Sequence, residues 1–318
     1  MLNLTNRIHP RHLRLILAIR DTGQLAMAAE RLSMTQPAAS RMLVAIERTI
    51  GVPVFERHPK GMTATNAGEV LARNAMSLLN GLDQTLHDIE AINSGRAGVI
   101  RVGAVTGGAV AFVIPAIREL KKTAVGSEIH VDVAPSNVLI DSLLKGEHDF
   151  VLSRIPPGTD ARQFEIRRGR VELIQFLVRR DHPLTGRDGL RLADLAGFEW
   201  VIQAPQTPLR QAVEEAFVSR GLELPSEMVN TTSLLFMIAY LASSDAIAPI
   251  SREVAELIGP GSFGGSVVAL EVEEPIIVHP YHLISRKNQI ASPLAMRLRD
   301  LVFKALTAHG SQSAGGAG

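Results

Sequence analysis

Two helical patterns in the first fifty residues are separated by a break of only two residues, at positions 33–34. The first of these patterns contains a pair of small residues, Ala28 and Ala29. Helices joined by so short a turn must cross steeply and closely, and only small side chains allow that approach. The second pattern opens at Thr35, which is suited to capping a helix, and has Pro37 in its first turn, where the missing N–H is not needed. With a further helical pattern at residues 11–20, this arrangement predicts a helix-turn-helix.

The helix predicted over residues 35–50 has two faces of different chemistry. Leu43 and Ile46 belong to a buried apolar stripe. The first turn instead presents Gln36, Ser40 and Arg41 on an exposed side. In a helix-turn-helix, the N-terminal residues of the second helix reach base edges in the major groove, where Gln can pair with adenine and Arg with guanine. An ordinary three-helix core with a polar face is the alternative at this point.

A short extended stretch at residues 51–57 leads into a basic turn at residues 58–62, and residues 63–65 return to a new helix. A basic hairpin tip after a helix-turn-helix is typical of a wing. Such a wing would lay Arg57, His58 and Lys60 along phosphates or in a minor groove. The presence of this hairpin makes the alternative interpretation, an ordinary three-helix core, less well supported.

The charge is distributed unevenly along the chain. Residues 1–65 contain nine Lys and Arg against four acidic residues, a formal charge of +5, whereas the remainder carries −4. A basic N-terminal segment followed by a mildly acidic remainder suggests that the N-terminal segment alone binds a polyanion. A solvated surface with a chance asymmetry is the other explanation of the charges taken alone.

These residues are part of a longer pattern, AxxxxxxxQPAxSRxxxxIExxxGxxxFER…TxAG, which runs from Ala28 to Gly68. The pattern resembles the LysR-type transcriptional regulators, and the similarity covers nearly the whole chain. The resemblance implies a winged helix-turn-helix DNA-binding domain at residues 1–65, double-stranded DNA as a partner and RNA polymerase as a possible second one. We expect contacts with DNA from nine residues: Gln24, Thr35, Gln36, Pro37, Ser40, Arg41, Arg57, His58 and Lys60.

A single helix is expected over residues 66–93, because apolar residues recur there at spacings of three and four. The narrow stripe consists of Leu71, Ala75, Leu78, Leu82, Leu86 and Ile89. A core helix of one domain is the alternative, but the resemblance implies a linker helix that forms a dimer, with dimers pairing into a homotetramer. A two-fold dimer would set two recognition helices about one helical turn apart on a pseudo-palindromic operator. Residues 94–98 are expected to form a hinge.

Beyond the hinge, strands alternate with helices, which is typical of α/β layers. Strands are expected at residues 99–105, 129–134, 150–154, 171–178, 200–203, 246–250 and 282–285. Helices are expected at residues 109–122, 139–145, 208–220, 233–242, 251–257 and 293–308, before a disordered tail at 311–318.

The resemblance implies that residues 99–310 form a two-lobed α/β domain like that of periplasmic binding proteins, with a Rossmann-like arrangement and a ligand cleft between the lobes. Lobe I would comprise residues 99–161 and 266–310, and lobe II residues 162–265. The chain would cross between them near Arg162 and return near Gly265.

Three loops that follow strands and lead into helices favour anions or hydroxyl-rich ligands, because the first N–H groups of a helix are free. These loops lie at residues 105–108, 135–137 and 230–233. An arginine near such a loop could clamp a carboxylate or phosphate. The candidate ligand contacts are Thr106, Gly107, Ser136, Arg154, Arg210, Thr231 and Thr232. Plain helix capping is the alternative role for each hydroxyl.

Several function classes are disfavoured. The chain contains no Cys, and it shows neither HExxH nor GxSxG. GAVTGGA is not a dinucleotide or P-loop pattern, so no cofactor, metal or enzymatic activity is expected. The N-terminus lacks the apolar run of a secretory signal, and no apolar run is long enough to cross a bilayer, so we expect a cytoplasmic protein. A two-lobed solute-binding protein without a regulatory role would need export and would leave the basic N-terminal segment unexplained.

The sequence therefore predicts a ligand-responsive transcriptional regulator with a small-molecule inducer. Within the LysR-type family, the sequence segments from His12 to Arg41 and from Phe55 to Glu69 resemble the branch that regulates sugar-uptake or sugar-binding-protein genes. There is also similarity to the branch that controls aromatic-acid catabolism. Arg154 and Arg210 would suit an acid, whereas loops rich in Thr and Ser would suit a sugar. The inducer is thus a sugar, a sugar acid or an aromatic acid.

Overall fold

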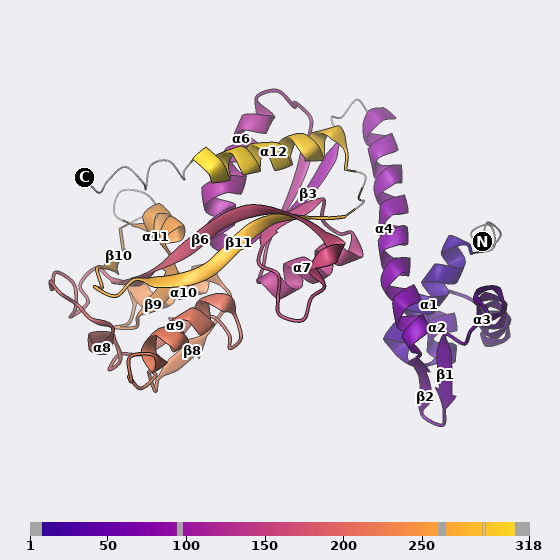
Figure 1. The fold of residues 1–318 in the computed structure, drawn as a ribbon, viewed down its shortest axis with the longest axis horizontal. Helices are drawn as coiled ribbons and strands as arrows, with labels where there is room; N and C mark the ends of the chain where they lie inside the picture. Colours follow the sequence, from indigo (N-terminus) through magenta and orange to yellow (C-terminus); the bar gives the residue numbers. More distant parts are fainter. Residues whose placement is uncertain (1–7, 94–97, 260–264, 288, 290, 309–318) are drawn as a thin grey trace. The chain divides into compact units, whose positions relative to one another are not determined.

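The computed structural model describes residues 8–93, 98–259, 265–287, 289 and 291–308, which divide into two compact units. The first unit begins with three helices, α1 (Pro10–Thr22), α2 (Leu25–Arg31) and α3 (Gln36–Ile50) (Figure 1). An antiparallel hairpin of β1 (Phe55–His58) and β2 (Gly61–Ala64) follows, and then the long helix α4 (Asn66–Asn93). Most of the expected hinge, and the whole of the expected tail, lie outside the described residues.

The helix boundaries in the first unit follow from local chemistry. The hydroxyl of Thr35 accepts a hydrogen bond from the N–H of Ala38 at 3.4 Å and so caps α3. Gly51 ends α3 at a φ of 87°, in the left-handed region that glycine adopts without strain. Ala28, Ala29 and Ala39 are at most 1% exposed, so the close crossing of α2 and α3 that the small residues predicted is present.

Helix α4 divides its apolar residues between two environments. Ala75 is fully buried in the core of the first unit, and Leu71 packs against that core. Leu78, Leu82 and Leu86 are instead 63%, 42% and 53% exposed. The apolar stripe expected from the sequence is therefore not one continuous surface. Its first two residues complete the core of the helix-turn-helix, and only the later residues are exposed in this chain.

The second unit is built on a seven-stranded sheet with the order β10-β6-β11-β5-β3-β4, in which β9 also pairs with β6. A separate parallel pair is formed by β7 and β8. The strands are β3 (Val99–Ala104), β4 (Glu128–Val133), β5 (Phe150–Ser153), β6 (Phe164–Arg179), β7 (Trp200–Ile202), β8 (Met228–Asn230), β9 (Ala248–Ser251), β10 (Val267–Leu270) and β11 (Ile276–Arg286).

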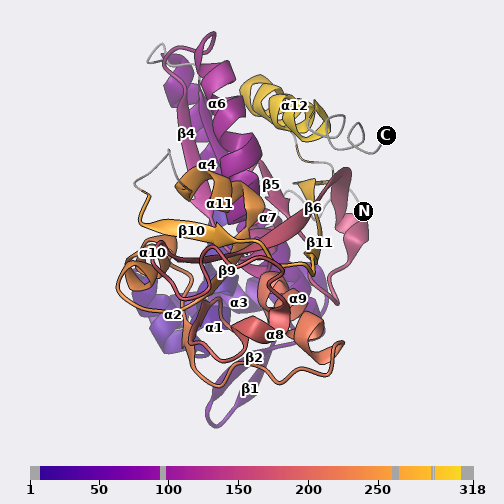
Figure 2. The same ribbon diagram turned by 90° about the vertical axis from the view of Figure 1, so that its left-hand side faces the viewer.

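The remaining helices follow α4 along the chain. They are α5 (Thr106–Gly108), the π-helical turn η1 (Ala109–Val113), α6 (Ile114–Lys121), α7 (Ser136–Lys145), the short 3-10 helix η2 (Ala161–Gln163), α8 (Leu192–Leu195), α9 (Pro208–Val218), α10 (Leu234–Ala242), α11 (Arg252–Ile258) and α12 (Pro293–Ala308). Figure 2 shows α6 and α12 side by side, and a hydrogen bond from Arg297 to the hydroxyl of Thr123 joins α12 to the end of α6.

Two long antiparallel strands, β6 and β11, run through the whole second unit (Figure 1). The first part of β6 pairs with β11 alone, and its last part pairs with β9 and β10. Strand β10 comes after the return expected near Gly265, yet Val267 and Leu270 are buried in the same cores as the helices α9 and α10. Strand β10 therefore lies with β9 beside the last part of β6.

The core near β7 is organised around Trp200, which is fully buried. Its indole N–H donates to the carbonyl of Leu195 at 3.0 Å, and the rings of Phe176 and Phe217 meet it edge-on with centroids 5.5 Å away. Strands β8 and β10 and the helix α8 were not predicted from the sequence, although the equally short strands β5, β7 and β9 were. Residues 109–113, expected to be helical, form the π-helical turn.

Candidate DNA interface and ligand pocket

The first turn of α3 is an open surface. Thr35, Gln36, Pro37 and Arg41 are exposed, and Ser40 is half-buried. The opposite side of α3 is held in the core by Ala39, Leu43 and Ile46, each at most 1% exposed. The residues that the sequence assigned to base contacts therefore share one accessible end of the helix.

The hairpin β1–β2 presents a second basic surface. Arg57, His58 and Lys60 are exposed, and in the part of the chain that the structure describes neither Arg57 nor Lys60 forms an ion pair. Nε2 of His58 lies 3.8 Å from a carboxylate oxygen of Glu56. The hairpin carries two cations that are available to an external anion.

Backbone contacts fix the hairpin to the turn between α1 and α2. The N–H of Met62 donates to the carbonyl of Gly23 at 2.7 Å. Gly61 has a φ of 142°, and a Cβ at this position would lie 2.3 Å from that same carbonyl oxygen. Gln24, the first residue after the turn, is exposed and touches this junction through its Cγ, 3.6 Å from the same Cβ position.

Two further side chains hold the hairpin, and sequence reasoning did not single them out. Oε1 of Glu47 accepts hydrogen bonds from the N–H groups of Val54 and Phe55, at 2.9 and 3.4 Å, and so ties the start of β1 to α3. The hydroxyl of Thr65 donates to the carbonyl of Pro53 and accepts from the N–H of Gly68. The only signal for these roles was their membership of the family pattern.

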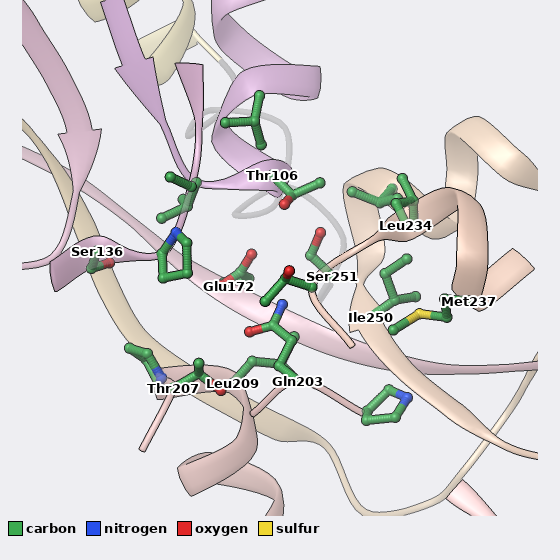
Figure 3. A pocket seen from close by; sticks show the side chains of 18 of the residues that line it. Thr106, Ser136, Glu172, Gln203, Thr207, Leu209, Leu234, Met237, Ile250 and Ser251 are labelled. Atoms are coloured by element: carbon green, nitrogen blue, oxygen red, sulfur yellow. The ribbon is translucent and has the colours of Figure 1, made fainter. Parts of the chain in front are cut away.

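The second unit contains a cavity of about 200 Å³ that is lined by residues from several segments between Val105 and Val254 (Figure 3). This volume is below the ~300–1,000 Å³ typical of pockets for drug-sized ligands, so the cavity suits a small metabolite. Five of the predicted ligand contacts line it: Thr106, Ser136, Arg154, Thr231 and Thr232. The three loops selected from the sequence therefore meet at one cavity.

Two of the predicted ligand residues have other positions. Gly107 does not line the pocket, but its Cα faces the pocket floor, since a Cβ there would lie 2.7 Å from Oε1 of Glu172 and 2.8 Å from Oγ of Ser251. The structure corrects the expectation for Arg210. Its guanidinium donates to Glu214 and to the side chain of Asn230, both at 2.6 Å, and it is absent from the pocket lining.

The pocket floor is a group of buried polar side chains. Arg154 donates from Nη2 to Oε2 of Glu172 at 2.5 Å and from Nε to the carbonyl of His279 at 2.6 Å. Its guanidinium carbon also lies 5.5 Å from the centroid of the Tyr281 ring. Burial raises the pKa of Tyr281 well above its usual value, and burial likewise raises the pKa of Glu253.

Glu172, Gln203 and Ser251 line the pocket and were missed from the sequence (Figure 3). Glu172 lies within the long strand β6, where no loop or helix start marks it. Ser251 ends strand β9 immediately before α11, which is the same strand-to-helix arrangement that selected the other loops. That signal was available for Ser251.

Comparison with known families identifies the chain. A family model described as a bacterial regulatory helix-turn-helix protein of the lysR family matches residues 10–69. A second, described as a LysR substrate binding domain, matches residues 93–307, which is more than half of the chain. The chain belongs to the LysR family. It is therefore a DNA-binding transcriptional regulator with an effector-binding domain, and neither matching family model describes an enzyme.

Relatives of this LysR-family protein include two regulators named GbpR. The GbpR of Rhizobium radiobacter is 39% identical over 249 residues, covering 78% of this chain and 82% of that protein. The GbpR of Azospirillum brasilense is 32% identical over 292 residues, covering 91% and 84%. The crystal structure of CbnR, a LysR family transcriptional regulator, matches the fold with a TM-score of 0.62 at 20% identity, covering 94% of this chain and 99% of CbnR.

A structure of full-length CbnR complexed with its target DNA has the same TM-score of 0.62, at 20% identity, and covers 94% of this chain and all of that one. At this level of identity the likeness supports the fold. None of the helices in the described ranges has the length and apolar character that crossing a bilayer requires.

Proposed function

We propose that this regulator binds a pseudo-palindromic operator as a dimer and responds to a small metabolite held in the pocket of its second unit. Each subunit would insert the first turn of α3 into a major groove and lay the β1–β2 hairpin along the adjacent backbone. The observation that carries the DNA-binding part is the accessible end of α3, which presents Gln36, Ser40 and Arg41 while the buried face of the helix is held in the core by Ala39, Leu43 and Ile46.

The dimer would form through the later part of α4. Leu78, Leu82, Leu86 and Ile89 leave an apolar stripe uncovered in the isolated chain. A second copy of the helix would bury that stripe and would place the two recognition helices on symmetric half-sites. Two dimers would then pair into a tetramer, and RNA polymerase is the partner on which a DNA-bound regulator would act.

The ligand would act by favouring one arrangement of the oligomer over another. A ligand that binds two arrangements equally changes nothing, so the pocket must differ between them. The pocket is suited to such a role because residues from several segments line it, from Thr106 in α5 to Thr232 after β8. We expect Thr106→Ala to blunt the response to the inducer without changing the affinity for DNA in its absence.

The DNA-binding part is tested by measuring operator and non-operator affinities over a range of salt concentrations. A steep negative slope of log K against log salt is expected, because several phosphates are contacted. Arg41→Ala should remove about 1–3 kcal/mol of sequence discrimination, whereas Lys60→Ala should weaken all sequences alike and reduce the slope by about one.

Arg48→Ala is the matched control, since it removes the same charge from the exposed last turn of the same helix. It should leave the ratio of operator to non-operator affinity unchanged. If Arg41→Ala retained the full ratio, the assignment of the α3 surface would be wrong. If the wild-type protein bound operator and non-operator DNA equally well at moderate salt, the whole proposal would be wrong.

A further inference from the structure

The charges in the pocket compensate each other. Arg154 and Glu172 are the only ionisable residues among the described side chains that line it, and they form an ion pair with 2.5 Å between Nη2 and Oε2. Both side chains are at most 10% exposed. Arg210, the other cation considered for the ligand, is paired with Glu214 outside the pocket. A carboxylate ligand would therefore meet no unpaired positive charge here.

Two polar atoms in the buried floor of the pocket have no hydrogen-bond partner among the described residues. Oε2 of Glu172 accepts a hydrogen bond from Arg154. None of the described residues donates a hydrogen bond to the other carboxylate oxygen of Glu172, Oε1. Oγ of Ser251 has no hydrogen-bond partner among the described residues either, although the residue is only 3% exposed. A buried hydroxyl left in this state costs free energy until something bonds to it.

These two atoms are neighbours. They lie 2.7 and 2.8 Å from the position that a Cβ on Gly107 would take, and both residues line the pocket, so the hydroxyl groups of one small ligand in the pocket could reach both of them. Figure 3 shows Glu172 and Ser251 near the centre of the pocket, with the amide of Gln203 beside them. The carboxylate can only accept hydrogen bonds, so the matching ligand group is a donor.

The remaining lining favours an aliphatic, polyhydroxylated molecule. Leu209, Leu234, Met237 and Ile250 supply apolar surface, whereas none of the described lining residues is aromatic. An aromatic acid would thus find neither a ring to stack on nor a free cation. Hydroxyls on a ligand would instead find Glu172, Ser251 and Gln203 on one side and C–H contacts on the other.

We propose that the inducer is an uncharged polyhydroxy compound of monosaccharide size, and that Glu172 and Ser251 select it by bonding to its hydroxyl groups. This inference rests on the proposed function of the pocket and narrows its ligand. A hydroxyl bonded to a carboxylate makes a charge-assisted hydrogen bond, about twice as strong as a neutral one. A sugar acid would bring a second carboxylate toward Glu172, which has only one cation to share.

The test measures binding to the full-length protein by calorimetry with neutral aldoses and their uronic acids, namely galactose and galacturonate, glucose and glucuronate, and mannose and mannuronate, together with benzoate. We expect at least one neutral aldose to bind, and its uronate to bind at least tenfold more weakly. Glu172→Gln should weaken that aldose at least tenfold and reduce or reverse the ratio, since Arg154 then carries an uncompensated charge.

Glu214→Gln is the matched control, because it breaks a comparable Arg–Glu pair outside the pocket, and it should leave both affinities unchanged. Ser251→Ala provides a second variant that does not disturb a buried charge. It should weaken the aldose several-fold without lowering the thermal midpoint of the free protein, because its hydroxyl has no partner in the described structure.

Tighter binding of any uronate or of benzoate than of every neutral aldose would overturn the inference, as would failure of all the aldoses to bind. An unchanged aldose-to-uronate ratio in Glu172→Gln would overturn the role of that carboxylate. Operator binding measured with and without each compound separates the two proposals. A response to an acid alone retains the regulator and refutes the sugar, whereas an aldose that binds tightly but never changes operator binding refutes the regulatory role of the pocket.

Discussion

Gly61 is the residue through which the position of the wing can be tested most directly. It lies at a φ of 142°, a backbone conformation that side chains other than glycine adopt only at a cost of about 1–3 kcal/mol. In Gly61→Ala the new Cβ would also fall 2.3 Å from the carbonyl oxygen of Gly23. Because that carbonyl accepts the hydrogen bond from Met62, moving it away should cost a further ~0.5–1.5 kcal/mol.

The expected total for Gly61→Ala is therefore about 1.5–4.5 kcal/mol. Gly51→Ala is the matched control in the same unit, since Gly51 has a φ of 87° but open space around its Cβ position. It should show the backbone cost alone, about 1–2 kcal/mol. The difference between the two variants isolates the contact between the wing and the turn that joins α1 to α2.

Amide hydrogen exchange is the suitable assay, because it reports the free energy of opening separately for each part of a two-unit protein. The slowest amides of α1 give the stability of the first unit. Gly61→Ala should also weaken binding to operator and non-operator DNA alike, since the wing cations address phosphates. If Gly61→Ala destabilised α1 no more than Gly51→Ala, the wing would not be fixed at this contact and the reasoning would be refuted.

Two further predictions concern other parts of the chain. Leu82→Glu and Leu86→Glu should dissociate the dimer proposed for α4 while leaving the monomer folded, because both positions are exposed in the single chain; light scattering with circular dichroism measures both properties, and an unchanged mass would contradict the dimer helix. Burial lowers the pKa of His182 below 6.5. As the pH falls below about 6.5, the unfolded chain therefore takes up a proton that the folded chain does not, and the free energy of unfolding decreases, by at most ~1.4 kcal/mol per pH unit. In His182→Gln, urea titrations between pH 7 and pH 5 should show a shallower decrease, and an equal slope would contradict the assignment.

Much of the fold could be predicted because its signals are local. Thr35 and Gly51 mark the ends of α3 by their own chemistry, and the small residues at 28 and 29 predict the crossing of α2 and α3. The short strand β8 could not be found, because its pairing with β7 depends on a segment that is 28 residues away in sequence. The equally short strands β5, β7 and β9 were predicted, so length alone does not decide which elements the sequence reveals.

The stripe on α4 shows the limit of periodicity. Its spacing correctly indicated one helix, but Leu71 and Ala75 pack within their own unit whereas Leu82 and Leu86 are exposed. Spacing indicates that a face is apolar, and it carries no information about which surface covers that face. The dimer therefore remains a prediction for the exposed part of the stripe alone.

The two arginines considered for the ligand show which errors in the site were avoidable. Arg210 has Glu214 four residues later on the same helix, a spacing at which side chains are neighbours, so its neutralisation could have been predicted from the sequence. Arg154 is neutralised by Glu172, 18 residues away on another strand, and only the pairing of β11 with both β5 and β6 brings the two together. Since both cations are compensated, the chemistry that remains for a ligand is that of hydroxyl groups and a carboxylate acceptor. The proposal of a sugar over an acid therefore rests on an acidic residue that no local pattern in the sequence marks.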